Sequence, residues 1–154
     1  MKRLTKEILL ETSASVLADC AFLMLDPVSE LAPSTGSAVV TTLPFSGVVS
    51  GTLRLCAPSQ LLLGAAADML GEPAGGDQAS EEAEATLSEL ANVLLGVLLA
   101  RAFGPRECPV IGLPSSVTVA GVSDVEGSLC SAVLADLEGQ PFVISILGQA
   151  EVAA

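Results

Sequence analysis

The sequence predicts an α+β fold in which long helices pack on one side of a mostly antiparallel sheet. Apolar residues recur at helical spacing in three segments, while β-branched runs occupy the others. The runs of strands are joined by short turns rather than by helical crossovers, which favours antiparallel pairing. The expected order of elements is α-β-β-α-α-β-β-β. Because composition does not change along the chain, residues 1–154 are expected to form a single domain.

The first half of the chain is expected to hold two helices and a hairpin. Residues 4–25 carry apolar side chains at helical spacing, and the Asp-Pro pair that follows is a stop signal. Residues 37–56 place β-branched runs on either side of a turn marked by glycines, which predicts a hairpin. Pro58 is expected to open the next helix and Gly71 to cap its end after Leu70.

The second half is expected to begin with a connection and a long helix, followed by strands. Residues 72–79, EPAGGDQA, lack the lysine and hydroxyl residue of a nucleotide-binding loop, so they are interpreted as a connection. Ser80 is expected to cap a helix that continues to Phe103 and has an acidic first turn. Strands are expected at residues 117–120, 129–137 and 142–147, with a tight turn at residues 138–141.

Charge and composition exclude several classes of function. The chain has 18 acidic and 6 basic residues, and its formal net charge of −12 would repel nucleic acid and anionic lipid. Glu11 and Asp19 interrupt the apolar run of a signal peptide, and Asp68, Glu89 and Arg101 interrupt the best candidate membrane spans. We therefore expect a cytoplasmic protein. Its hydrophobic content of 51% also predicts apolar surface that another copy or a partner covers.

The cysteines are interpreted as small buried hydrophobic residues in a reducing compartment. They lie far apart with no C-x-x-C pair, and the chain has no histidine to complete a zinc site. The four are Cys20, Cys56, Cys108 and Cys130. No metal site of the chain's own is expected.

The helix of residues 80–103 is expected to have one apolar and one sparsely polar side. Helical geometry places these residues on the core side: Leu87, Leu90, Ala91, Leu94, Leu95, Val97 and Leu98. The opposite side holds Ala85, Ser88, Glu89, Asn92, Gly96 and Ala100. Glu89 and Asn92 are therefore neighbours on that side. Gly96 costs about 1 kcal/mol relative to alanine in a helix interior, which indicates that something approaches the backbone there.

By itself this pattern leaves two ordinary alternatives open. Glu89 and Asn92 fit the solvated edge of any helix, because an E-x-x-N match arises easily by chance. The stripe of small residues also fits a helix-packing face, with Asn92 hydrogen-bonded inside the protein.

Three motifs together resemble the CheX branch of the CheC/CheX/FliY chemotaxis phosphatases. They are F-x-G-x-x-x-G-x-L-x-L at residues 45–55, Leu-Gly at residues 70–71 and ELANVLLG at residues 89–96. The similarity extends over residues 4–147 and includes the order of elements. In that family an acidic residue and an asparagine at E-x-x-N on a long helix are followed, after a spacer, by a proline, a part that Pro114 can play.

The resemblance implies that the chain hydrolyses the aspartyl phosphate of a CheY-like response-regulator receiver. Asn92 would orient the attacking water, and Glu89 would accept a salt bridge from the receiver's lysine. The resemblance also implies a homodimer with no cofactor of its own, since the receiver domain supplies Mg²⁺. A single site is expected because residues 11–14, ETSA, lack the asparagine of a second E-x-x-N.

Two residues depart from the family pattern. Ala85 stands four residues before Glu89, where Asp or Ser is expected, and Pro114 comes one residue early. They motivate an alternative in which the chain is a non-catalytic receiver-binding or dimerisation module of the same fold. A third interpretation, an apolar-ligand or structural α+β domain outside signalling, rests only on hydrophobic content and leaves the E-x-x-N stripe beside Gly96 unexplained.

Overall fold

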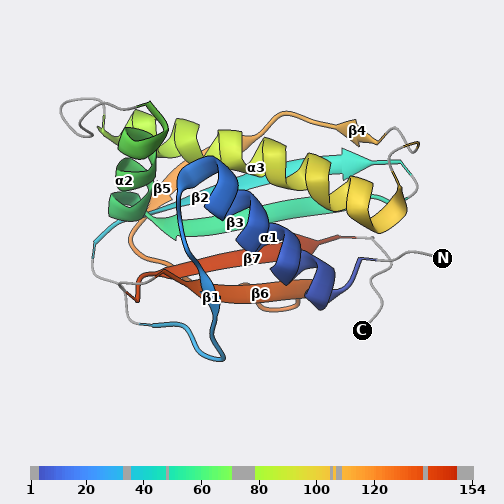
Figure 1. The fold of residues 1–154 in the computed structure, drawn as a ribbon, viewed down its shortest axis with the longest axis horizontal. Helices are drawn as coiled ribbons and strands as arrows, with labels where there is room; N and C mark the ends of the chain where they lie inside the picture. The colour runs from blue at the N-terminus through green and yellow to red at the C-terminus, as the bar shows by residue number, and fades with distance from the viewer. Residues whose placement is uncertain are drawn as a thin grey trace.

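The described residues form an antiparallel sheet with helices on one side (Figure 1). The computed structural model describes residues 4–32, 36–47, 49–70, 79–104, 106, 109–136 and 139–148. The helices are α1 (Lys6–Ala21), α2 (Ser59–Leu70) and α3 (Ala79–Phe103). The strands are β1 (Asp26–Pro27), β2 (Ala38–Ser46), β3 (Gly51–Pro58), β4 (Val110–Ile111), β5 (Ser115–Val119), β6 (Cys130–Ala135) and β7 (Pro141–Leu147).

Strand pairing confirms the predicted fold class. The sheet order is β1-β6-β7-β3-β2-β4, with β5 also paired to β2, and every pairing is antiparallel. Without the two-residue strands β1 and β4, the element order is the predicted α-β-β-α-α-β-β-β. Those two strands were not expected, because two residues carry no alternating pattern that a sequence could display.

Two predicted helix boundaries are wrong. Helix α1 ends at Ala21 rather than near Leu25, because Phe22 adopts a left-handed conformation with φ 58°. The Leu23 N–H then donates to the Leu17 carbonyl at 3.1 Å, which closes the helix end as a glycine usually does. Pro58 ends β3 instead of opening a helix, and α2 begins at Ser59.

Other predicted boundaries differ by small amounts or lie outside the described residues. Helix α3 begins at Ala79, one residue before the predicted cap Ser80. Of the predicted connection at residues 72–79, Ala79 is instead the first residue of α3, and residues 72–78 lie outside the described part of the chain, as does the predicted cap Gly71. In the turn before β7, the Asp136 N–H donates to the Gln140 carbonyl at 3.2 Å, and Gly139 has φ 79°.

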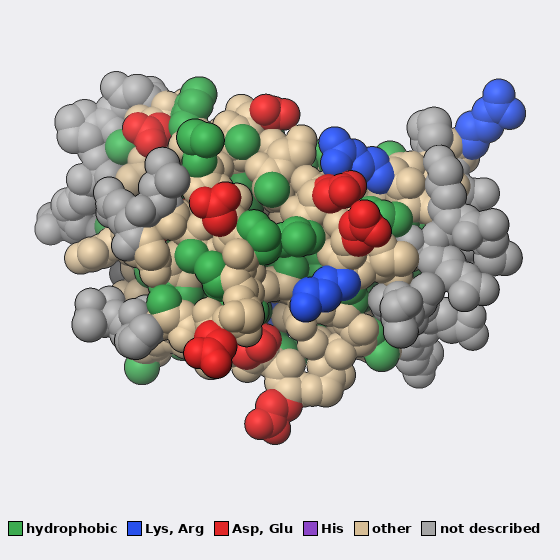
Figure 2. Space-filling model, turned by 60° about the horizontal axis from the view of Figure 1, so that its bottom comes forward, with side chains coloured by type: hydrophobic (Ala, Val, Ile, Leu, Met, Phe, Trp, Pro, Cys, Tyr) green, Lys and Arg blue, Asp and Glu red, His purple; other side chains and the backbone are tan. Residues whose placement is uncertain are grey.

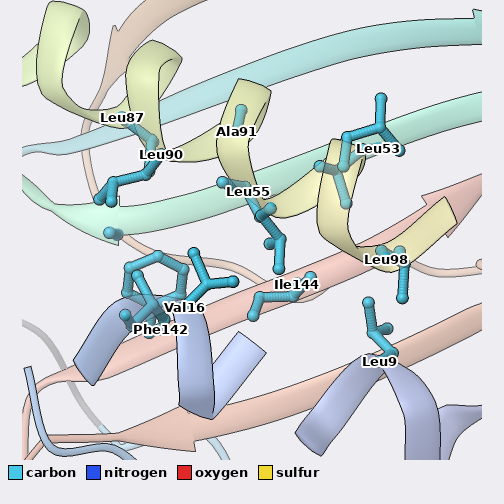
Figure 3. Packing of buried hydrophobic residues seen from close by; sticks show 14 of the residues in the cluster. Leu9, Val16, Leu53, Leu55, Leu87, Leu90, Ala91, Leu98, Phe142 and Ile144 are labelled. Carbon is cyan, nitrogen blue, oxygen red and sulfur yellow. The ribbon is translucent and has the colours of Figure 1, made fainter. Parts of the chain in front are cut away.

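The core lies between the sheet and the three helices and is almost entirely aliphatic. Side chains of α3 point toward those of β3 and β7, and α1 closes the same space (Figure 3). Phe142 is a fully buried aromatic residue among leucines, valines and isoleucines. Burying one such side chain contributes about 1.5–3 kcal/mol, so the helix faces are fixed mainly by the hydrophobic effect.

Helix α3 presents its predicted apolar side to the sheet. Leu87, Leu90, Ala91, Leu94, Leu95 and Leu98 are all buried, and the predicted core residue Val97 is half-buried. The exposed positions are spaced by three or four residues, as one stripe of a helix requires. They are Glu81, Ala85, Glu89, Asn92, Gly96 and Ala100, joined by Arg101 near the end.

Hydroxyl groups tie α3 to the sheet at the level of this stripe. The Ser116 Oγ of β5 lies 2.7 Å from the Ser88 Oγ of α3 and 2.6 Å from the Thr41 Oγ1 of β2. It is also 3.5 Å from the Glu84 carbonyl oxygen, to which it donates. Thr41 is fully buried, so its hydroxyl depends on Ser116.

The opposite side of the sheet carries a second, smaller apolar cluster. Its buried members come from β2, β3 and β7, and half-buried residues of loops and of β5 pack against them. The buried members are Ala38, Val40, Cys56 and Val143, and the half-buried ones are Leu31, Val119 and Val122. The connection between β5 and β6 therefore passes over this side of the sheet.

We predict that Ser116→Ala lowers the free energy of unfolding by about 1–3 kcal/mol, because the buried Thr41 hydroxyl loses its partner. Chemical denaturation monitored by circular dichroism measures the change. Ser115→Ala is the matched control, since Ser115 is the exposed neighbour on the same strand and should change stability by less than about 0.5 kcal/mol. Equal effects of the two substitutions would contradict a stabilising role for the hydroxyl network.

Candidate functional site

The candidate site is the outward stripe of α3 that carries Glu89 and Asn92. Both side chains are exposed, while Leu90 and Ala91 between them are buried. A separation of three residues places the two polar groups about 5–6 Å apart at Cβ on one face. The structure thus brings the two predicted residues together and directs them to solvent.

Neither polar side chain is used by the fold. Within the described residues, Glu89 and Asn92 take part in no side-chain hydrogen bond or ion pair. The helix positions four before and four after Glu89 are Ala85 and Val93, which offer no charge partner. Of the alternatives left open by the sequence, the one with Asn92 hydrogen-bonded inside the protein is therefore wrong.

The backbone beside the pair is open. A Cβ built on Gly96 meets nothing within 4 Å, so packing against the described residues does not require a glycine there. Ala85 and Ala100 are exposed on the same stripe. The exposed side chains of the stripe are therefore small, except for the Glu89 carboxylate and the Asn92 amide near its centre.

The elements beside α3 hold the stripe in place. Ser88 directly precedes Glu89 and is bonded to Ser116, so β5 supports the helix next to the site. Pro114 immediately precedes β5 and is half-buried. Ser116 and Thr41 were not predicted as contributors, because their contact with Ser88 depends on strand register between distant segments.

The described residues offer no metal-binding cluster, and their buried cysteines are unreactive. No group of three or more Cys, Asp or Glu side chains lies close enough to hold a metal ion among the described residues. Cys56 and Cys130 are free and buried, as predicted, whereas Cys20 is half-buried and Cys108 lies outside the described residues. Burial raises the pKa of both the Cys56 and the Cys130 thiol, which keeps them protonated and unreactive.

Helix α3 also bears on the question of a membrane span. By length and composition alone, its segment Glu81–Phe103 is apolar enough to cross a membrane. Half of the most apolar stretch is buried inside the protein, and its leucines form the core against the sheet. The apolar composition of the segment is explained by its place as the core helix of the domain.

Apolar side chains also reach the surface. Figure 2 shows hydrophobic side chains gathered near the middle of one face, with acidic side chains spread around them. The large exposed apolar residues of the described chain are Phe22, Met24, Val28, Val110, Leu113, Val117 and Leu129. The structure thus agrees with the prediction that apolar surface remains uncovered, and the predicted homodimer stays a prediction.

Solved structures share this fold over nearly the whole chain. CheX from Vibrio vulnificus aligns with a TM-score of 0.71 at 20% identity, covering 92% of this chain and 93% of that one. A chain of the CheX–CheY–BeF3–Mg²⁺ complex from Borrelia burgdorferi aligns with a TM-score of 0.65 at 20% identity, covering 92% and 95%. FliY from Thermotoga maritima aligns with a TM-score of 0.59 at 14% identity, covering 92% and 87%.

Sequence comparison gives the family. No curated protein matches the chain. The family model for the chemotaxis phosphatase CheX matches residues 39–134, a segment that runs from β2 into β6 and includes all of α3. The matched segment exceeds half of the 154 residues and contains both Glu89 and Asn92. The chain belongs to the CheX family of chemotaxis phosphatases.

Proposed function

We propose that the chain hydrolyses the aspartyl phosphate of a CheY-like response-regulator receiver. One observation carries the proposal: Glu89 and Asn92 are exposed on the outward stripe of α3 and make no side-chain bond to the described residues, within the segment that matches the CheX family. A solved neighbour from Borrelia burgdorferi contains CheX together with CheY, BeF3 and Mg²⁺, which supports a receiver as the partner.

Asn92 is proposed to orient the attacking water. A carboxamide offers both a donor and an acceptor, so it can hold water in line with the phosphorus atom. It is neutral, whereas a carboxylate at the same place would be repelled by the phosphoryl group. The water oxygen forms the new bond to phosphorus, the bond to the aspartyl oxygen breaks, and the water's proton leaves with inorganic phosphate.

Glu89 is proposed to fix how the two proteins dock. An exposed carboxylate one helical turn from Asn92 can accept a charge-assisted hydrogen bond from the lysine of a receiver. The receiver's own Mg²⁺ would neutralise charge that develops on the phosphoryl group. This chain is therefore proposed to need no metal of its own. The expected cytoplasmic location and homodimer are part of the same proposal.

The second candidate is a non-catalytic module that binds receivers without hydrolysing their phosphate. Ala85 favours it, since an exposed methyl group four residues before Glu89 supplies no supporting hydrogen bond. A dephosphorylation assay with several phosphorylated receivers separates the candidates. Turnover of a receiver supports the phosphatase, and saturable binding without turnover by any receiver supports the module.

Replacing Asn92 tests the water-positioning role. Asn92→Ala is expected to lower the rate of phosphate release by about 100-fold or more, because the water loses its orientation. Binding of the phosphorylated receiver, measured by fluorescence anisotropy, should stay within about twofold. A variant that releases phosphate as fast as the parent protein would rule out the role given to Asn92.

Replacing Glu89 tests the docking role. Glu89→Lys should weaken receiver binding by about tenfold or more, since a cation then faces the receiver's lysine, and Glu89→Ala should have a smaller effect. At saturating receiver the maximal rate of either variant should stay near that of the parent. Unchanged affinity of Glu89→Lys would remove Glu89 from the interface.

Gly96 tests whether the receiver approaches the open backbone of α3. Gly96→Ala is expected to raise the free energy of unfolding by about 1 kcal/mol, because alanine is the better helix former and the new Cβ meets no atom of the described residues within 4 Å. The same substitution should weaken receiver binding. Gly64→Ala is the matched control, since Gly64 is also helical, exposed and without atoms near a built Cβ, yet lies on α2. Unchanged binding in both variants would place the receiver away from Gly96.

A further inference from the structure

The side of the sheet opposite the helices carries one row of polar side chains across five strands. Strand register places them next to one another in the order Ser115, Thr42, Arg54, Ser145 and Ser131. Side chains alternate between the two faces of a strand. The neighbours Leu53, Leu55 and Ile144 belong to the helix-side core, so this row faces away from the helices and from the outward stripe of α3.

Two adjacent members of the row each have a buried polar atom without a hydrogen-bond partner among the described residues. The Arg54 Nη1 atom and the Ser145 Oγ atom are inaccessible to solvent and have no hydrogen-bond partner among the described residues. Ser145 is 0% exposed. The two residues are directly paired between β3 and β7, and paired residues have Cβ atoms about 4.5–5.5 Å apart. Buried charges and buried donors in proteins are normally paired, so the Arg54 Nη1 and Ser145 Oγ atoms need a hydrogen-bond acceptor.

The missing acceptor should be negatively charged. The row offers a guanidinium group and hydroxyl groups, and no carboxylate lies within it. In a chain with 18 acidic residues, Arg54 nevertheless forms no ion pair in the part that the structure describes. The loop over this side carries Asp124 and Glu126, both exposed, and the Asp124 carboxylate accepts the Val125 N–H at 2.8 Å.

The surroundings favour a small ligand that reaches the row from solvent. Arg54, Thr42 and Ser131 are half-buried, so one side of the row is accessible. Along the strands the row is bordered by the buried apolar residues Val40, Cys56 and Val143. An ion bound there would be partly withdrawn from water, where its attraction to a guanidinium group is stronger than at an open surface.

We propose that this row binds a small oxyanion through the guanidinium group of Arg54 and the hydroxyl group of Ser145, with Thr42 and Ser131 beside them. A guanidinium group donates two parallel hydrogen bonds to an oxyanion, which suits phosphate and carboxylate ligands. The proposed site is separate from Glu89 and Asn92, which lie on the helix side of the sheet. It does not depend on the proposed phosphatase activity.

Titration calorimetry on the full chain tests the site with inorganic phosphate and, in parallel, acetate. The parent protein is expected to bind phosphate saturably. Arg54→Gln should weaken the affinity by about tenfold or more, because it removes the charged donor. The control Lys6→Gln also removes one positive charge, from an exposed position on α1, and should leave the affinity unchanged. Binding of phosphate alone would assign the site to tetrahedral oxyanions, and binding of both ions would assign it to oxyanions in general.

Ser145→Ala tests the site independently, in case Arg54→Gln does not fold. Removing a fully buried hydroxyl without a partner should leave the unliganded protein at least as stable as the parent. The same change should weaken phosphate binding several-fold. Absence of saturable binding by either ion, or equal phosphate affinity in the parent, Arg54→Gln and Ser145→Ala, would overturn the proposal and leave water as the partner of these groups.

Discussion

The packing of the leucine face of α3 on the sheet is the constraint on which the candidate site depends. Successive residues of a helix are about 100° apart, so a rotation by one position would turn Asn92 toward the side and carry a buried leucine into solvent. Each exposed leucine would cost about 1.5–3 kcal/mol. The orientation of Glu89 and Asn92 is therefore set by residues that lie between them, such as Leu90 and Ala91, rather than by contacts of their own.

The hydroxyl network adds a second, directional constraint to this packing. Apolar contacts fix which face of α3 is buried, but they allow small displacements along the helix axis. The bonds from Ser116 to Ser88 and Thr41 have lengths of 2.7 and 2.6 Å and join α3 to two neighbouring strands. Since Ser88 directly precedes Glu89, the network restrains the helix at the site itself. Such restraint would favour the water-positioning role proposed for Asn92, because catalysis by positioning depends on exact geometry.

Local periodicity made the fold and the faces of α3 predictable from sequence. The exposed stripe and six buried residues of α3 follow from a period of 3.6 residues. Ser88, predicted on the outward side, is instead half-buried, because it is bonded to Ser116 of β5. Features set by nonlocal contacts could not be predicted in this way. The register that aligns Ser116 with Thr41, and Arg54 with Ser145, depends on strands far apart in the chain. The early end of α1 was missed because Phe22 occupies a left-handed position that a sequence usually marks with glycine.

The two proposed sites differ in the exposure of their polar groups. Glu89 and Asn92 are exposed on the helix side of the sheet, whereas polar atoms of Arg54 and Ser145 are buried on the other side. On the helix side the polar side chains of the candidate site stand outside the core, exposed and without bonds to the described residues, so burial imposes no cost on them. On the far side Arg54 and Ser145 are held within the surface of the sheet itself, where an unpaired donor is unfavourable. A polar group exposed to water needs no partner within the protein, whereas the buried Arg54 Nη1 and Ser145 Oγ atoms lack both water and a hydrogen-bond partner among the described residues. The exposed pair on α3 therefore suits the proposed docking protein, and the two buried atoms of the far side suit the proposed small ion.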